Sequence, residues 1–297
     1  MQIGTFGLRR VTERISAAVG TARAIPIYLL SVSVSVQASQ SIDVTRIDTN
    51  MAVDSVAVDG VTWHDPKAEP FRLLGFRWIG QDRVYRRLPL VAEGDIPPKV
   101  DNLANHTSGG QIHFQTDSRR ILLRVRLARG KPMYHMTQVG KVGFDCDAGP
   151  PGNQRFTGVT KFAFGAREYT AQVAFNSSGK MVPLTINFPL YNGVESVEVG
   201  LDEHAQLGAP LPLDDCRPVV IYGTSITQGG CATRPGMSYP NILSRRLNRE
   251  VVNLGFSGSG KGEPEIAHLI NEIPDKSLVI LDFECNTHES LRELLAP

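Results

Sequence analysis

Three positions in the last third of the chain carry groups that acyl-transfer chemistry uses. They are the Ser225 hydroxyl, the Gly258 N–H and the Asn286 carboxamide, and each follows a short apolar run. A serine hydroxyl can attack an acyl carbon, and N–H donors can stabilise the oxygen that becomes negative. The pattern therefore predicts a serine nucleophile and an oxyanion hole made by Gly258, Asn286 and the N–H of Ser225 itself. A turn or helix-capping role for Ser225 is the alternative.

The apolar runs before these positions are typical of strands buried on both faces of a parallel sheet. Residues 219–222, 251–255 and 278–282 form short runs rich in aliphatic residues, the first ending at a glycine. Helices are predicted over 238–249 and 263–273. Alternating strands and helices predict a doubly wound α/β layout. The carboxyl ends of its strands meet at one edge, where ligands bind in such folds.

The motifs around these positions resemble those of the SGNH (GDSL-type) hydrolase superfamily. The matching segments are Gly223-Thr-Ser-Ile-Thr227, Asn253-Leu-Gly-Phe-Ser-Gly258 and Asp282-Phe-Glu-Cys-Asn286. The resemblance implies that Ser225 is the nucleophile and that the Gly258 N–H and the Asn286 carboxamide are oxyanion donors. It also implies a flavodoxin-like three-layer domain of strand order 2-1-3-4-5. This chain supplies only the strands in the order 2-1-3. The resemblance implies no metal or organic cofactor.

The chain departs from the family pattern at two places. Thr224 stands where the family has Asp, and no Asp is followed three residues later by His. The family's D-x-x-H block supplies the catalytic base and the carboxylate that orients it. We therefore expect a chain that lacks its last segment and is nearly inert, because losing the base costs about 10⁶ in kcat in a well-studied protease. Residues 278–283 would form an apolar sheet edge, and residues 217–297 alone would be insoluble or molten.

The histidines provide no obvious substitute for that base. His288 lies two residues after Asn286, and Asp282 or Glu284 could orient it. It leaves the same strand as Asn286, however, so a solvent-facing position is the favoured interpretation. His106 lies in a loop motif and could line the substrate site. The other histidines are interpreted as structural or surface residues: His64, His113, His135, His204 and His268.

The region before the linker has the pattern of an antiparallel β-sandwich or jelly roll. Short stretches with alternating apolar residues, separated by turn clusters, are typical of such sheets. The predicted strands cover 111–116, 123–127, 161–164, 169–175, 182–188 and 194–200.

This region is also similar to the β-sandwich that precedes the esterase domain in one bacterial branch of the superfamily. The segments that carry the similarity are 102–109, 136–145 and 189–196. The family's G-x-D-L-Y motif reads Gly143-Phe-Asp-Cys-Asp147 here, so its last two residues differ. The predicted organisation is a signal peptide at 1–38, an irregular lead-in at 39–59, a β-sandwich domain at 60–206, a linker at 207–217 and a truncated hydrolase domain at 218–297.

The N-terminal segment has the features of a secretory signal. Four arginines and a single glutamate precede an apolar core at 25–36, and Ala38 follows at a plausible cleavage point. Secretion or a periplasmic location in a bacterium is the expectation. A transit peptide, or a start codon assigned too far upstream, is the alternative interpretation.

The composition excludes several classes of function. A net charge of +1 gives no electrostatic basis for binding nucleic acid. The sequence has no run of 18 apolar residues, which a membrane-spanning helix would need. Four cysteines without a C-x-x-C spacing do not favour a zinc site, and four buried free thiols are favoured over two disulfides. The sequence does not indicate an oligomeric state.

These observations predict a serine esterase. The resemblance suggests short-chain or O-acetyl esters of small molecules or carbohydrates as substrates. Two alternatives stay open: a glycan-binding sandwich attached to a degenerate esterase remnant, and an acyltransferase that uses the same residues.

Overall fold

The computed structural model describes residues 44–48, 56–90 and 95–287. Contacts divide the chain into two compact units, Met1–Met51 and Ala52–Pro297. In the first unit the described part is a short 3-10 helix, η1 (Val44–Arg46). The predicted signal peptide at 1–38 lies outside the described residues, as does His288. Everything below concerns the second unit.

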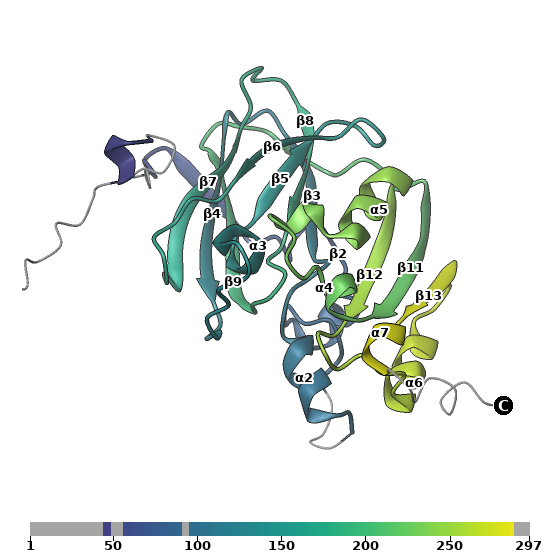
Figure 1. Cartoon of the computed structure of the whole chain (residues 1–297). Coiled ribbons are helices and arrows are strands. Elements are labelled where there is room, and N and C mark those ends of the chain that lie inside the picture. Colours follow the sequence, from purple (N-terminus) through teal and green to yellow (C-terminus); the bar gives the residue numbers. More distant parts are fainter. Residues whose placement is uncertain (1–43, 49–55, 91–94, 288–297) are drawn as a thin grey trace, which may run out of the picture. The chain divides into compact units, whose positions relative to one another are not determined.

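Two antiparallel sheets form the part of this unit that was predicted to be a sandwich, and this prediction is confirmed (Figure 1). The four-stranded sheet has the order β1 (Val61–His64), β9 (Val194–Asp202), β4 (Arg120–Leu127), β7 (Glu168–Phe175). The six-stranded sheet has the order β10 (Leu207–Gly208), β3 (Gln111–Thr116), β8 (Val182–Asn187), β5 (Asp145–Ala148), β6 (Arg155–Val159), with β2 (Arg72–Leu74) also on β3.

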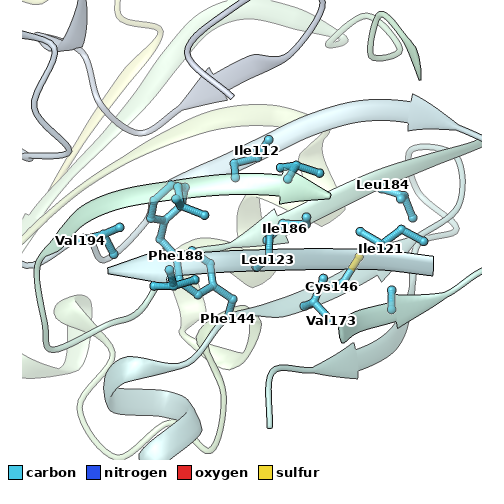
Figure 2. Packing of buried hydrophobic residues seen from close by; sticks show 14 of the residues in the cluster. Ile112, Ile121, Leu123, Phe144, Cys146, Val173, Leu184, Ile186, Phe188 and Val194 are labelled. Carbon is cyan, nitrogen blue, oxygen red and sulfur yellow. The ribbon is translucent and has the colours of Figure 1, made fainter. Parts of the chain in front are cut away.

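The core of the sandwich follows from alternation along the strands. In β4, Leu123 and Val125 are buried while Arg124 and Arg126 between and beside them are exposed, as expected where one face of a strand meets the core. Figure 2 shows β4 residues beside Ile112, Ile186 and other apolar residues of the opposite sheet. Full burial of each large aliphatic side chain contributes about 1.5–3 kcal/mol to stability.

The strand predicted at 161–164 is wrong. The segment is irregular, Phe162 stacks on Tyr169 with the ring centroids 4.4 Å apart, and Phe164 is 89% exposed. Alternation here reflects one side chain packing from a loop, without a paired strand. The strands β5 and β6 were not predicted because β5 buries two acidic residues, Asp145 and Asp147, where an apolar face would be expected.

These two carboxylates bind the α/β part. Asp145 accepts from Arg234 at 2.5 Å and from the Gly236 N–H at 2.8 Å, while Asp147 lies 3.3 Å from Arg245. Asp145 is the Asp of the G-x-D-L-Y motif, so that motif fixes the segment ahead of helix α5. Its burial raises the pKa of the Asp145 carboxyl, although hydrogen bonds and the Arg234 charge oppose this.

The last part of the chain forms a parallel sheet with the predicted order, β12 (Arg249–Gly255), β11 (Asp215–Gly223), β13 (Leu278–Asp282). The helices after these strands are α4 (Ser225–Gln228), α5 (Tyr239–Leu247), α6 (Pro264–Glu272) and α7 (Glu284–Thr287), with a 3-10 turn η3 (Pro235–Met237) before α5. Helix α5 ends two residues earlier than predicted, because Asn248 turns into the left-handed region and Arg249 begins β12.

The two faces of this sheet have separate cores. Val220 and Tyr222 of β11 face a cluster that includes the apolar side of α6, whereas Val219 and Ile221 face Leu243 of α5 (Figure 1). The first cluster also holds residues of α2 (Pro98–Ala104). Two short helices, α1 (Ile79–Asp82) and α3 (Gln138–Val142), complete the described elements. The segment between β2 and β3 therefore helps to cover the parallel sheet.

Two observations concern the predicted apolar sheet edge and the search for a membrane-spanning segment. Among the described residues β13 pairs with β11 alone, and Leu278 and Leu281 are exposed, as expected for an edge strand. None of the helices in the described part of the chain is long and apolar enough to cross a membrane.

Candidate active site

Ser225 lies where the first parallel strand turns into a helix. β11 ends at Gly223, Thr224 is extended, and Ser225 is the first residue of α4. The Thr224 hydroxyl accepts a hydrogen bond from the Ile226 N–H at 3.3 Å, which is the role of an N-cap. Thr224 thus supplies a side-chain oxygen to cap this helix at the position where the family has Asp.

The main chain of Ser225 is held by three hydrogen bonds. Its carbonyl oxygen accepts from the N–H groups of Gly229 at 3.0 Å and Gly230 at 2.7 Å, and from the Tyr191 hydroxyl at 3.2 Å. Tyr191 is buried and follows strand β8, so the sandwich part helps to hold the serine. Within the described residues the Ser225 hydroxyl forms no hydrogen bond, which leaves it available to a substrate or a base.

The glycine-rich turn after β12 carries the second predicted residue. Gly258 has a φ of +65°, a conformation that glycine adopts without steric cost. It is exposed, and its N–H has no hydrogen-bond acceptor among the described residues. The preceding Ser257 N–H donates to the Gln228 side chain of α4 at 2.9 Å. The turn is therefore fixed to the nucleophile helix while the Gly258 N–H stays open.

Asn286 connects the third strand exit to the other two. Its carboxamide nitrogen donates to the carbonyl oxygen of Gly260 at 3.0 Å. Gly260 packs so closely on Gly223 that an added Cβ would overlap the Gly223 carbonyl oxygen. The structure therefore brings the segments that carry Ser225, Gly258 and Asn286 into contact at one sheet edge. An amide nitrogen has two hydrogens, so the bond to Gly260 leaves one for a substrate.

A partly buried cluster beneath this edge was not predicted from the sequence. Asp282 at the end of β13 accepts from the Thr227 hydroxyl at 2.7 Å and from the Tyr239 hydroxyl at 3.0 Å, and these two hydroxyls lie 2.9 Å apart. Burial, together with the Asp282 charge, raises the pKa of Tyr239 to about 12. The cluster joins β13, α4 and α5, so it fixes the helix that begins with Ser225. Asp282, which the sequence offered as a partner for His288, already accepts both of these hydrogen bonds at its Oδ2 atom.

His106 also has a partner in this region. The His106 Nδ1 accepts a hydrogen bond from Gln228 Nε2 at 3.0 Å. Gln228 Nε2 also donates to the Leu190 carbonyl oxygen at 3.2 Å. Burial, aided by the Arg87 and Lys141 charges, lowers the pKa of His106 to about 4. His106 is neutral near pH 7 and uses Nδ1 as an acceptor. It therefore positions Gln228, and among the described histidines none forms a hydrogen bond with the Ser225 hydroxyl.

Two family models match consecutive parts of the chain. The model described as the N-terminus of SGNH hydrolase-type esterases, GxDLY, matches residues 61–207. The model described as the GDSL-like lipase/acylhydrolase family matches residues 216–294. The chain belongs to the SGNH (GDSL-like) hydrolases. No curated protein is similar enough to count as a match.

Two solved structures share this architecture. A GDSL-like lipase from Bacteroides ovatus is 28% identical with a TM-score of 0.68, and the alignment covers 75% of this chain and 64% of that one. A salicylyl-acyltransferase from a tetracycline biosynthetic pathway is 19% identical with a TM-score of 0.57, covering 77% of this chain and 64% of that one. The second likeness concerns the fold alone. This SGNH hydrolase chain spans less than two thirds of the length of either protein.

A buried arginine holds strand β12 of this SGNH hydrolase just ahead of the Gly258 turn and was missed in the sequence. Arg87 is fully buried and donates to backbone carbonyls at both Asn253 (3.2 Å) and Gly255 (2.5 Å) of β12. It also donates to the His106 and Leu103 carbonyls. Burial lowers its pKa to about 9. An Arg in a polar segment before the sandwich gives no sequence signal for this role.

The described residues of this hydrolase do not form a metal centre. No group of three His, Cys, Asp or Glu side chains among them could hold an ion. All four cysteines are unpaired. Cys146 is buried, but the other three are exposed, so the prediction of buried thiols is wrong for them. The site contains the Ser225 hydroxyl, the Gly258 N–H and the Asn286 amide, and hydrogen bonds with neighbouring segments hold the elements that carry them.

Proposed function

We propose that this SGNH hydrolase acts on acyl esters with Ser225 as nucleophile and with Gly258 and Asn286 as oxyanion donors. The observation that carries the proposal is the contact between the three strand exits, made through Gly260. That glycine packs on Gly223 two residues before the serine and accepts a hydrogen bond from Asn286. Family membership alone would support an acylhydrolase without assigning these roles.

The reaction would proceed through a tetrahedral intermediate. The Ser225 oxygen attacks the ester carbonyl carbon, a base takes the hydroxyl proton, and the carbonyl electron pair moves to oxygen. The N–H groups of Ser225, Gly258 and Asn286 donate to that oxyanion. Collapse of the intermediate expels the alcohol and leaves an acyl-serine, which water then hydrolyses to the carboxylic acid.

Among the described residues no histidine is bound to the proposed nucleophile, Ser225. The sequence also lacks a D-x-x-H block. We therefore propose that the chain turns over slowly, because a site with an oxyanion hole but no base keeps about 10³–10⁴ of rate enhancement over water. Short acyl or O-acetyl esters, including those of carbohydrates, are the proposed substrates. The signal predicted at 1–38 would direct this activity out of the cytoplasm.

Chemical rescue tests the proposal. Hydrolysis of p-nitrophenyl acetate is measured for the full chain and for Ser225→Ala over increasing imidazole, which supplies a diffusible base. The expected result is a slow rate that depends on Ser225 and rises with imidazole beyond the increase in Ser225→Ala. Ser177→Ala, in an exposed loop, is the matched control and should behave as the parent. Equal rates for Ser225→Ala and the parent at every imidazole concentration would contradict the assignment of the nucleophile.

A further inference from the structure

The sandwich part contains a cavity that is separate from the Ser225 site. Its volume is about 510 Å³, within the range of small-molecule sites. It is lined mainly by apolar side chains from the segment 127–142 and the loop 164–167, among them Leu127, Met133, Met136, Val142 and Phe164. None of the lining residues belongs to α4 or to the turns that carry Gly258 and Asn286.

One lysine in the wall of this cavity has no partner. The Lys141 side chain lies in the last turn of α3 and is 8% exposed. Its ammonium group forms neither a hydrogen bond nor an ion pair with any described residue. Leaving a buried ammonium unpaired costs free energy, and burial lowers the pKa of Lys141 accordingly. Such a group is a ready partner for an anion.

Lys141 lines the cavity, and its ammonium is not fully enclosed by the protein. The fully buried side-chain polar atoms without partners, within the described residues, are Tyr85 Oη and Ser238 Oγ. Lys141 Nζ is not among them, so it retains contact with accessible space, and the space that Lys141 lines is this cavity. The α3 backbone fixes the lysine, since Lys141 donates to Thr137 and its carbonyl accepts from Tyr191.

The residues that line the cavity carry one positive charge without a partner among the described residues, that of Lys141. No Asp or Glu lines it, and its other cationic residue, Arg167, lies 3.3 Å from Glu195. A single unpaired ammonium in an apolar wall matches a monoanion better than a phosphate, which is more often bound by arginines or several backbone N–H groups. The exposed rings of Phe164 and Tyr134 extend the apolar surface at the lining.

We propose that this cavity binds a monocarboxylic acid with an apolar body, its carboxylate paired with Lys141 and its body against the methionines and Phe164. The site is distinct from Ser225 and does not depend on the proposed hydrolysis. The flexible side chains of Met133 and Met136 suit an alkyl chain, because methionine adapts its shape to irregular ligands. Neutral sugars would leave the ammonium unpaired.

Calorimetric titration of the full chain tests this with octanoate, 1-octanol and octyltrimethylammonium as probes. Octanoate should bind saturably to one site, and the alcohol and the cation should bind at least about tenfold more weakly, a difference of about 1.4 kcal/mol. Lys141→Met should weaken octanoate binding by a similar factor. Lys131→Met, an exposed lysine of the same segment outside the lining, should leave it unchanged.

A second variant guards against a folding defect in the first. Ala166→Phe places a ring in the cavity while Lys141 stays in place, and it should abolish octanoate binding while the melting temperature stays at that of the parent. Lys141→Met should also melt no lower than the parent, because it removes an unpaired buried charge. Equal binding of octanoate and octanol, unchanged binding in Lys141→Met, or no saturable binding in the parent would each overturn the proposal.

Discussion

Replacing Gln228 with leucine removes the side chain that joins the nucleophile helix to both the oxyanion turn and the sandwich loop. Gln228 is fully buried and makes three hydrogen bonds, with the Ser257 N–H, His106 Nδ1 and the Leu190 carbonyl. A buried polar group left without its partner costs about 1–3 kcal/mol. Ser257 is half-buried and can bind water instead, so we expect a loss of about 2–4 kcal/mol in the free energy of unfolding.

Urea unfolding of the full chain measures this loss, and Gln115→Leu is the matched control. Gln115 also donates to a backbone carbonyl, that of Ala209 at 2.7 Å, but the bond is exposed. Its loss should cost about 0.5 kcal/mol or less, as is usual for surface substitutions. The Ser225-dependent rate should fall in Gln228→Leu as well, since the turn that carries Gly258 loses its anchor. A Gln228→Leu loss no larger than the control would refute the view that this residue supports the site.

Two further predictions concern burial of charge. The folded pKa of His106 is about 4 and its ordinary value is 6.5, so between these values the unfolded chain holds a proton that the folded chain lacks. The free energy of unfolding should therefore fall as pH decreases from 6.5 toward 4, by at most about 1.4 kcal/mol per pH unit from this group. Urea unfolding at two pH values should show a smaller decrease for His106→Asn than for the parent. An equal decrease in both proteins would contradict the low pKa of His106. Asp145→Asn removes the carboxylate nearest the Arg234 cation, which keeps only Asp147 at 3.9 Å, and should cost about 3 kcal/mol. Glu198→Gln, which breaks the exposed pair with Arg124, should cost less than about 1 kcal/mol. Similar losses in the two variants would show that the buried pair does not hold the two parts together.

The sequence was informative where the burial pattern is simple. The run 219–222 is apolar without interruption, and the run 251–255 contains Asn253 as its one polar residue. Both faces of the parallel sheet are covered, which explains these runs, and the structure places a strand over each of them. The same principle explains the failure at β5. Cys146 of β5 lies in the sandwich core, and the opposite face of the strand carries Asp145 and Asp147, which are buried because arginines from far along the chain pair with them. A local pattern does not contain that information.

The candidate site was predictable in part for a related reason. Ser225, the Gly258 turn and Asn286 could be assigned to one edge because each follows a parallel strand, and strand ends converge. The residues that hold these three in place could not be predicted from the sequence. Arg87 and His106 come from segments about 120 residues or more before the oxyanion elements they support. Their partners are backbone carbonyls and an amide, which leave no charge pattern in the sequence.

The central claim is that Ser225, Gly258 and Asn286 converge on one oxygen atom. A crystal structure of the chain after reaction with diethyl p-nitrophenyl phosphate tests it directly, because the adduct places a phosphoryl oxygen where the oxyanion would form. The account predicts phosphorus bonded to the Ser225 oxygen, with the phosphoryl oxygen about 2.7–3.1 Å from both the Gly258 nitrogen and the Asn286 carboxamide nitrogen. An adduct whose phosphoryl oxygen contacts neither group, or modification of a different serine, would contradict it.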